Sequence, residues 1–376
     1  MNQNRRDFLT ALVLSALGGG ETFGSEKRVG KEVLNADGIL ERMRAANGFP
    51  ALAGAVANGS EILAAGASGL RCMGKGEPVK VEDRFHFGSL TKSMTATLAA
   101  RIVEQKKIRW DSTVGEVLHG WSGDVHQSYR DVTLERLLLH RGGAPADAPK
   151  EIWREAWRKT GTARAQRERF VRSLLKMGAP TPPDTKFVYS NQGYAIAGAM
   201  LEEVSDLAWE ALLEKEVFEK VGMKTAGFGV PGLPGEAQEP WGHVQEGAGY
   251  KAVQQDNPPA IGPAATVHGS VLDFVRYGAL HLNGARGVST DYLESAAWKK
   301  LHTPAPGQIY AMGWASKEDA WTGGPALWHN GSNTLFYAIL WVSPGRNLTV
   351  GVVANADTKD VRQTCEKAAE ALAGLV

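Results

Sequence analysis

The chain has 376 residues, which is long enough for a large core and for about two domains. Hydrophobic residues make up 43% and charged residues 22%, and the 42 Lys and Arg against 41 Asp and Glu leave a net charge of +1. This balance excludes the broad charged surface typical of proteins that bind nucleic acid or anionic membranes, and favours a small-molecule or peptide substrate.

The N-terminus has the pattern of an export signal. Arg5-Arg6 precede the apolar run Ala11–Leu17, and the glycines Gly18–Gly20 follow it. We interpret residues 1–24 as a twin-arginine (Tat) signal, so the precursor would meet the Tat export machinery and the protein would be periplasmic or secreted. An uncleaved amphipathic helix is the alternative. The apolar run is shorter than the roughly 20 residues that span a bilayer, and no cysteine follows it, so we expect no stable membrane anchor.

The sequence contains two cysteines, Cys72 and Cys365. An oxidising compartment would permit a disulfide between them but does not require one, and two buried free thiols are the expected state. Their spacing fits neither a metal site nor a haem site, so we expect no cofactor.

The first part of the chain predicts a helix, a hairpin and a second helix. A helical pattern begins at Asp37 and ends near Gly48. Strands at 51–57 and 61–67 flank Asn58-Gly59, a dipeptide suited to the positive φ angles of a hairpin turn. A helix from Ser89 to about Gln105 follows, and it is apolar on most sides, which predicts a buried helix.

The remaining sequence alternates between a helical middle and strands near the end. We predict helices at 133–140, within 151–177, at 195–204, 209–221, 271–282 and 359–375, a long surface loop at 231–263, and strands at 335–342 and 348–354. Strands at both chain ends with helices between them indicate an α/β domain made of residues 35–110 and 241–376. Residues 111–240 would form an inserted, mainly helical domain.

Ser89-Leu90-Thr91-Lys92 begins the predicted buried helix with a hydroxyl and an amine on one face. Residues three apart on a helix are neighbours, so the amine of Lys92 can reach the hydroxyl of Ser89. A serine hydroxyl is a weak nucleophile until a base accepts its proton, and burial disfavours the charged form of lysine. This spacing also occurs by chance at solvated helix ends, so it needs partners elsewhere in the chain.

Two further motifs supply those partners. Tyr189-Ser190-Asn191 lies in the helical middle, and His329-Asn330-Gly331-Ser332 precedes a strong strand. With Ser89-x-x-Lys92 they resemble the serine β-lactamase and penicillin-binding-protein superfamily, on the branch of class C β-lactamases, D-Ala-D-Ala carboxypeptidases and β-lactamase-like esterases. The resemblance covers most of the chain after residue 35, including the segments 137–143, 182–191, 213–223, 310–314 and 350–355.

The resemblance implies a fold and residue roles. The fold would be an antiparallel sheet flanked by helices, with the active site between it and the helical insert. Ser89 would attack a carbonyl carbon, and Lys92, alone or with Tyr189, would take the proton. Asn191 would bind Lys92 and a substrate amide, and the backbone N–H groups of Ser89 and Ser332, beside Gly331, would form the oxyanion hole. Tyrosine titrates at about pH 10, so a base role for Tyr189 requires a nearby positive charge such as Lys92.

His329 departs from the lysine that typical class C β-lactamases have at this position. Histidine titrates at about pH 6.5, so we expect a partial charge at neutral pH. If that charge binds a substrate carboxylate, KM for an anionic substrate should rise between about pH 5.5 and 8. The bulky run 334–337 is expected to narrow the acyl pocket.

Other aromatic residues and histidines have weaker support. One or two of Trp241, Trp314 and Trp328 are expected to line the pocket, because they lie close in sequence to the motifs. The remaining histidines, including His86 and His140, are expected to be structural or surface residues.

Three functions compete on this sequence. The first is an exported serine hydrolase that cleaves an ester or amide through a Ser89 acyl-enzyme, in the manner of a peptidase (a carboxypeptidase, for example) or an esterase. The second is a β-lactamase. The third is a penicillin- or peptidoglycan-binding protein with little turnover, which the presence of Ser89, Lys92 and Tyr189 together disfavours.

The export signal can be tested with a reporter fused to residues 1–30. Replacing Arg5 and Arg6 together by lysine should abolish export of the folded reporter, because the signal is read through the arginine pair. Periplasmic reporter activity is the measurement. Export that persists in the double variant would contradict the interpretation.

Overall fold

The computed structural model describes residues 32–59, 61–288 and 291–376, and the predicted export signal lies outside them. Residues Val33–Val376 form one compact unit. Within the described part of the chain, every helix is too short or too polar to cross a membrane.

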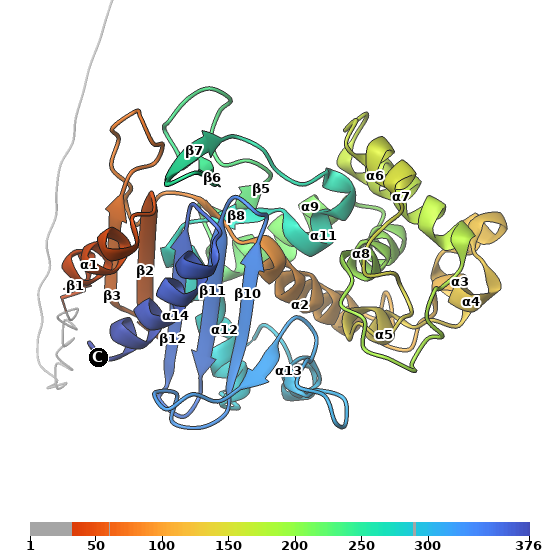
Figure 1. The fold of residues 1–376 in the computed structure, drawn as a ribbon. Helices are drawn as coiled ribbons and strands as arrows, with labels where there is room; N and C mark the ends of the chain where they lie inside the picture. The colour runs from red at the N-terminus through yellow and green to blue at the C-terminus, as the bar shows by residue number, and fades with distance from the viewer. Residues whose placement is uncertain (1–31, 60, 289–290) are drawn as a thin grey trace, which may run out of the picture. The chain divides into compact units, whose positions relative to one another are not determined.

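A seven-stranded sheet organises this unit, with the strand order β1-β3-β2-β12-β11-β10-β9 (Figure 1). Every neighbouring pair is antiparallel except β1 and β3. The strands are β1 (Leu34–Asn35), β2 (Ala51–Asn58), β3 (Glu61–Gly69), β9 (Ala315–Lys317), β10 (Ala326–Ser332), β11 (Tyr337–Ser343) and β12 (Leu348–Ala354). The prediction of an antiparallel sheet built from both chain ends is confirmed, and the predicted hairpin turn has Gly59 at a φ of 57°.

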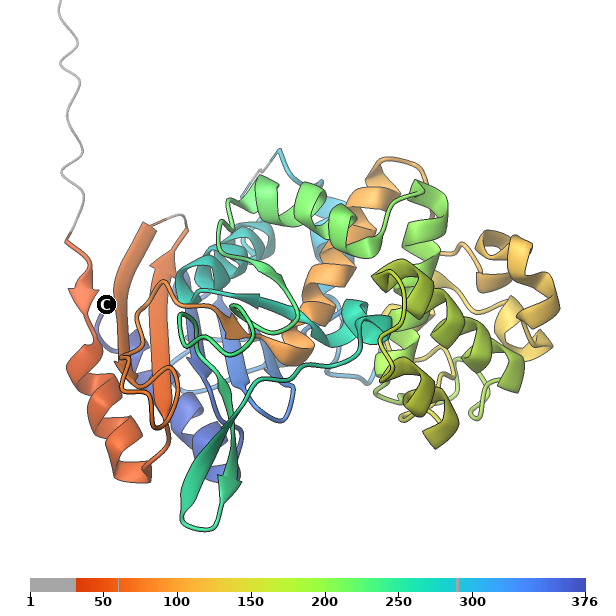
Figure 2. The ribbon, with the colours of Figure 1, turned by 90° about the horizontal axis from the view of Figure 1, so that it is seen from above.

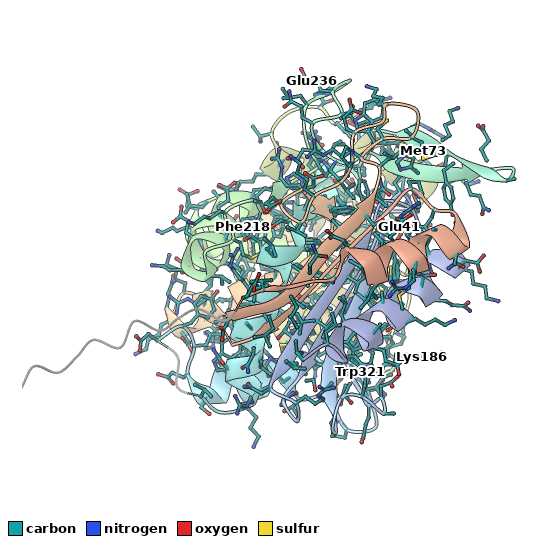
Figure 3. The ribbon with its side chains drawn as sticks, turned by 90° about the vertical axis from the view of Figure 1, so that its left-hand side faces the viewer. Glu41, Met73, Lys186, Phe218, Glu236 and Trp321 are labelled. Atoms are coloured by element: carbon teal, nitrogen blue, oxygen red, sulfur yellow. The ribbon has the colours of Figure 1, made fainter. Side chains whose placement is uncertain are left out.

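Both faces of this sheet are buried, because helices cover each of them. Along β2, Ala53 and Ala55 join the core beneath α12 (Val271–Ala285), while Leu52 and Val56 join a second core beneath α1 (Asp37–Asn47) and α14 (Lys359–Ala373). Figure 3 shows α1, which carries Glu41, and α14 lying across the strands on this second face. A strand covered on both sides has no polar face, so β2 is apolar almost throughout.

Most of the helical middle of the chain gathers beyond α2 (Thr91–Glu104), away from β1 and β3, while its last helix contacts α12 (Figures 1 and 2). Its elements are α3 (Val114–Val117), η2 (His119–Asp124), α4 (Gln127–Arg130), α5 (Leu134–Leu138), α6 (Lys150–Ala156), α7 (Ala163–Met177), α8 (Asn191–Ser205), α9 (Trp209–Leu213), the π-helical turn η3 (Glu214–Phe218) and α10 (Glu219–Val221). The predicted helices are present here, although α8 begins at Asn191, earlier than expected. The predicted domain boundaries stay a prediction.

The expected long loop at 231–263 is wrong in part. It contains a hairpin of β6 (Gly242–Glu246) and β7 (Gly249–Val253), followed by η4 (Pro259–Ile261) and the start of α11 (Gly262–Ala265). Half of the residues in its two strands are exposed, and these strands lack the apolar alternation that identifies a half-buried strand.

Three short strands form a small sheet in the order β4-β8-β5. They are β4 (Phe85–His86), β8 (Val267–Gly269) and β5 (Gly227–Phe228). The remaining helix, α13 (Ser295–His302), packs against α12 and α2. Two-residue strands produce no periodicity in a sequence, so β4 and β5 could not be predicted.

One buried arginine joins the helical middle to the segment before α11. Arg167 of α7 is fully buried and donates hydrogen bonds to Glu202 of α8 at 2.9 Å and to Glu210 of α9 at 2.8 Å. It also donates to the backbone oxygen of Pro259 at 2.9 Å. Buried charges need such partners, since an unpaired charge in the core is strongly destabilising.

Replacing Arg167 by methionine should lower the free energy of unfolding by about 3–5 kcal/mol, because Glu202 and Glu210 would lose their common partner. Urea unfolding is the measurement. Arg109→Met is the matched control, since Arg109 also contacts two carboxylates but its side chain is 64% exposed. We expect little change in the control, and equal losses in both variants would contradict the argument.

Candidate active site

The Ser89 motif lies where the chain passes from β4 into α2. Gly88–Leu90 form the short 3-10 turn η1, and α2 follows at Thr91. Gly88 has a φ of 53°, a backbone conformation that favours glycine and turns the chain sharply before Ser89. As predicted from its composition, α2 is buried on almost every side, and Lys92 is fully buried.

Lys92 contacts three groups from three separate parts of the chain. Its Nζ lies 3.0 Å from Ser89 Oγ, 2.7 Å from Asn191 Oδ1 and 3.0 Å from the backbone oxygen of Ala264. The structure therefore brings together the serine, the lysine and the asparagine that the sequence motifs predict. Ala264 of α11 was not predicted, because a backbone carbonyl has no signature in a sequence.

Burial lowers the pKa of Lys92 well below its usual value of 10.5. A neutral amine has two N–H donors and one lone pair. The oxygens of Asn191 and Ala264 only accept hydrogen bonds, so they can take both N–H groups. The lone pair of Lys92 then faces the hydroxyl of Ser89, which is the geometry that a general base needs.

Tyr189 lies beside this pair, immediately before α8. The Lys92 Nζ lies 4.7 Å from the centre of the Tyr189 ring. Tyr189 is 38% exposed. Desolvation around its phenol nevertheless raises the pKa to about 12, although a hydrogen bond with Ser89 acts in the opposite direction. At neutral pH Tyr189 is thus a protonated phenol that can donate a proton.

His140 positions Tyr189. This role of His140 was not predicted from the sequence. Its ring lies 4.4 Å from the Tyr189 ring and 4.9 Å from that of Tyr310, and its Nδ1 accepts the backbone N–H of Ser190 at 3.1 Å. The backbone oxygen of His140 accepts the N–H of Val188 at 2.9 Å. His140 was expected to be structural or on the surface, and its role is structural, but it acts on the loop that carries Tyr189.

Two glycines let the Ser89 turn lie directly against β10. A Cβ atom at Gly88 would lie 2.3 Å from the backbone nitrogen of Ser332, and one at Gly331 would lie 2.0 Å from the backbone oxygen of Phe87. Side chains at either position would force the two segments apart. The close approach places the residues that carry the predicted oxyanion-hole amides, Ser89 and Ser332, on adjoining segments.

The partial charge expected of His329 is wrong. His329 is 4% exposed, and burial, with a smaller contribution from Lys92, lowers its pKa to about 3. Its Nε2 lies 3.2 Å from the Tyr310 hydroxyl and its Nδ1 lies 2.5 Å from the backbone oxygen of Asn330. Histidine 329 is therefore neutral between about pH 5.5 and 8, and the basis for a pH-dependent KM falls away.

The bulky run 334–337 stays a prediction as a wall of the acyl pocket. Its Leu335 and Phe336 are both buried, Phe336 against Phe85 and His86. Trp314 is fully buried against Tyr277 and His281, and Trp328 packs against Trp341. These side chains belong to the core, because burying a large aromatic side chain stabilises the fold.

Trp241 and the two cysteines were also singled out in the sequence. The Trp241 ring lies under the Lys75 ammonium at 4.6 Å, and its indole N–H donates to the backbone oxygen of Glu236. Cys72 and Cys365 are buried free thiols, as expected.

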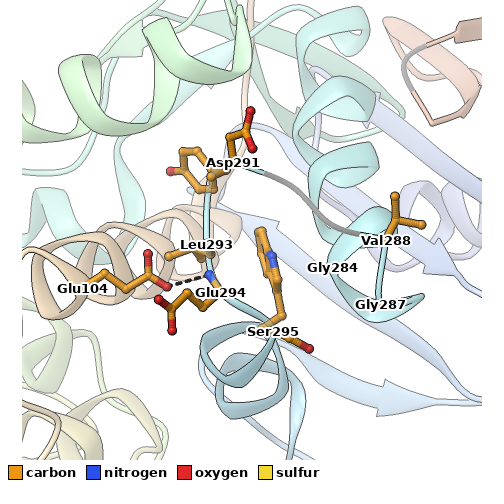
Figure 4. Close-up of a pocket in the computed structure, with 10 residues that line it drawn as sticks. Glu104, Gly284, Gly287, Val288, Asp291, Leu293, Glu294 and Ser295 are labelled. Carbon is orange, nitrogen blue, oxygen red and sulfur yellow. Dashed lines mark hydrogen bonds between the residues drawn. The ribbon is translucent and has the colours of Figure 1, made fainter.

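A separate cavity lies away from Ser89. A cavity of about 530 Å³ is lined by Glu104, Tyr292, Glu294 and Trp298 among others (Figure 4). Glu104 ends α2 and is twelve residues beyond Lys92, which corresponds to about 18 Å along a helix. The volume of this cavity therefore says nothing about the chemistry at Ser89.

Comparison with known proteins defines the class. A model of the Beta-lactamase family matches residues 36–374, so the chain belongs to this family of serine β-lactamase-like and penicillin-binding-protein-like hydrolases. Penicillin-binding protein 4 of Amycolatopsis lactamdurans is 28% identical over 305 residues, which cover 77% of this chain and 76% of that protein.

Solved structures share the fold. The octameric penicillin-binding protein homologue from Pyrococcus abyssi superposes with a TM-score of 0.73 at 21% identity, over 90% of this chain and 76% of that chain. EstCE1, a hydrolase with promiscuous acyltransferase activity, superposes with a TM-score of 0.71 at 17% identity, over 89% and 97% of the two chains. The predicted family and fold are confirmed.

The lowered pKa of Lys92 predicts a pH dependence of stability. Between the lowered value and 10.5, the unfolded chain binds a proton at Lys92 that the folded chain lacks. The free energy of unfolding should therefore rise with pH across this window, by on the order of 1 kcal/mol per pH unit relative to Lys92→Met. Urea unfolding of both proteins at about pH 8 and pH 10 measures this difference. A difference that stays constant would mean that Lys92 is charged in the folded protein.

Proposed function

We propose that the protein is a serine hydrolase that cleaves an ester or amide bond through an acyl-enzyme on Ser89. The observation that carries this proposal is the Lys92 amine, fully buried and 3.0 Å from Ser89 Oγ, with two backbone or amide oxygens in reach of its N–H groups. The family and the acyltransferase activity of EstCE1 agree with this chemistry.

Acylation follows from the positions of three side chains. Lys92 takes the proton of Ser89, and Ser89 Oγ bonds to the substrate carbonyl carbon. The carbonyl oxygen becomes negatively charged and is stabilised by the N–H groups of Ser89 and Ser332. The bond to the leaving group then breaks, and the leaving group takes a proton from the neutral phenol of Tyr189, which recovers one from Lys92.

Deacylation repeats these steps with water. Lys92, alone or through Tyr189, takes a proton from a water molecule, whose oxygen attacks the acyl carbon. The bond to Ser89 Oγ breaks and Ser89 regains its proton. Asn191 keeps Lys92 in place in both half-reactions, since its Oδ1 lies 2.7 Å from Nζ.

The environment of His329 supports a peptidase or an esterase over a β-lactamase. Penicillins and cephalosporins carry a carboxylate, which a fixed charge at this position would hold. His329 is buried and both its ring nitrogens have partners, so it offers no such charge at neutral pH. The second candidate is a β-lactamase, supported by the Beta-lactamase family model that matches residues 36–374. For localisation we propose the periplasm or secretion, supported by Arg5-Arg6 and the apolar run after them.

A substrate panel tests the proposed function. Wild type should hydrolyse p-nitrophenyl butyrate and D-amino acid amides faster than nitrocefin, and Ser89→Ala should lose at least about 1,000-fold in kcat because the nucleophile is absent. Intact-mass measurement should show one fluorophosphonate adduct on wild type and none on Ser89→Ala.

The alternatives have distinct outcomes. Fast nitrocefin turnover without esterase or amidase activity would identify a β-lactamase. Absence of any adduct and of any turnover, with retained penicillin binding, would identify a binding protein.

A further inference from the structure

A chain of buried polar side chains lies behind Ser89, outside the contacts that the proposed reaction uses. His86 is fully buried, Asp256 is 4% exposed and Asn333 is 9% exposed. His86 Nε2 lies 2.9 Å from Asp256 Oδ1, and Asn333 Nδ2 donates to the same oxygen at 3.2 Å. The three residues come from β4, from the segment after β7 and from the turn after β10.

The direction of each contact can be assigned. The backbone N–H of Gly88 donates to His86 Nδ1 at 3.0 Å, so this nitrogen carries a lone pair. The ring proton must then be on Nε2, which faces the carboxylate of Asp256. The carboxylate oxygen accepts an N–H from Asn333 at 3.2 Å. Its contact with His86 Nε2 at 2.9 Å is electrostatic and lacks the alignment of a hydrogen bond.

The row of side chains formed by His86, Asp256 and Asn333 ends, on each side, at a residue next to one of the proposed oxyanion-hole amides. Gly88 immediately precedes Ser89, and Asn333 immediately follows Ser332. Asn333 Oδ1 also accepts the backbone N–H groups of Leu335 at 3.2 Å and Phe336 at 3.0 Å, which fixes the turn after β10. The connection is side chain to side chain across segments that are far apart in the sequence.

Such an arrangement is costly unless it is complete. Desolvating a carboxylate and an imidazole disfavours folding, and an apolar core of the same volume avoids that cost. The hydrogen bonds that Gly88 donates to His86, and that Asn333 makes with Asp256, Leu335 and Phe336, are directional, however. An apolar contact cannot set the separation of two backbone amides as narrowly. An oxyanion hole needs that accuracy, since its donors must lie about 2.7–3.1 Å from the developing charge.

We propose that His86, Asp256 and Asn333 are positioning residues that hold the Ser89 and Ser332 amides at the separation required to bind a tetrahedral intermediate. The inference rests on the proposed acyl transfer at Ser89 and assigns that site a supporting layer. None of the three residues touches the substrate. They act through Gly88 and through the turn that follows Ser332.

Two variants interrupt the contacts among His86, Asp256 and Asn333. Each variant keeps the contacts at one end of this row of side chains. His86→Asn retains an acceptor where Nδ1 lies but is too short to reach Asp256. Asn333→Asp retains the acceptor for Leu335 and Phe336 but places a second carboxylate against Asp256. His281→Asn is the matched control, because His281 is also fully buried but bonds Thr97 and His302.

The readouts separate positioning from folding. Fluorophosphonate titration taken to completion counts active sites, and kcat and KM for p-nitrophenyl butyrate are expressed per active site. In His86→Asn and Asn333→Asp, kcat should fall about 10- to 100-fold with KM within about twofold, and Ki for phenylboronic acid should rise by a similar factor. The control should keep both constants within about twofold. Amide hydrogen exchange at residues 88–89 and 332 of the free protein should quicken in the two variants only.

Unchanged kcat per active site, unchanged Ki and unchanged exchange in both variants would overturn the inference, even if thermal stability falls. Should His86→Asn fail to fold, Asn333→Asp alone decides by the same criteria. Failure of the proposed function has another signature, since wild type would then give no fluorophosphonate adduct. Hydrogen exchange still reports on the two segments in that case, and faster exchange without an adduct would overturn the catalytic purpose of the chain.

Discussion

The whole site depends on one constraint, the burial of a single amine. Lys92 is removed from water, so its N–H groups must find acceptors inside the protein. Asn191 of α8 and Ala264 of α11 provide them. Neither element is near Lys92 in sequence, and Arg167 ties α8 to the segment just before α11. Elements that are far apart in the sequence therefore hold two oxygens around one nitrogen.

Burial acts in opposite directions on the two titratable groups beside Ser89. It lowers the pKa of Lys92 and raises that of Tyr189, because in both cases the charged form is disfavoured. A base and an acid thereby coexist at one pH. The neutral His329 fits the same scheme, because burial disfavours its charged form as well. The three residues form a site that is polar but carries little net charge.

The residues of the site that belong to sequence motifs could be predicted. Residues that act only through their position in the folded chain could not. Ser89, Lys92, Tyr189 and Asn191 were predicted because motifs in order mark them, and the structure brings them together. The Ala264 oxygen belongs to the backbone, and the contacts of His86 and His140 depend on segments that meet only in the folded chain. The charge of His329 was misjudged for the same reason: its titration follows from burial, which the sequence does not report.

The fold shows a similar division. Buried helices and strands with clear periodicity were predicted to within a few residues, as α2, α14 and β12 show. The hairpin of β6 and β7 was missed, because exposed strands of five residues resemble loops in composition. Its position was decided by tertiary contacts, among them the backbone bond from His243 to Leu335.

The pairing of β2 with β12 has a consequence for how the protein is made. Leu52 lies opposite Ala354, so the centre of the sheet joins the first long strand of the unit to the last. The ribosome delivers β2 early, and it must wait for almost the entire chain before its partner exists. During synthesis one edge of β2 stays unpaired, and the core beneath α14 stays open. The native sheet therefore closes only after β12 has been made, and until then the apolar β2 exposes an unpaired edge.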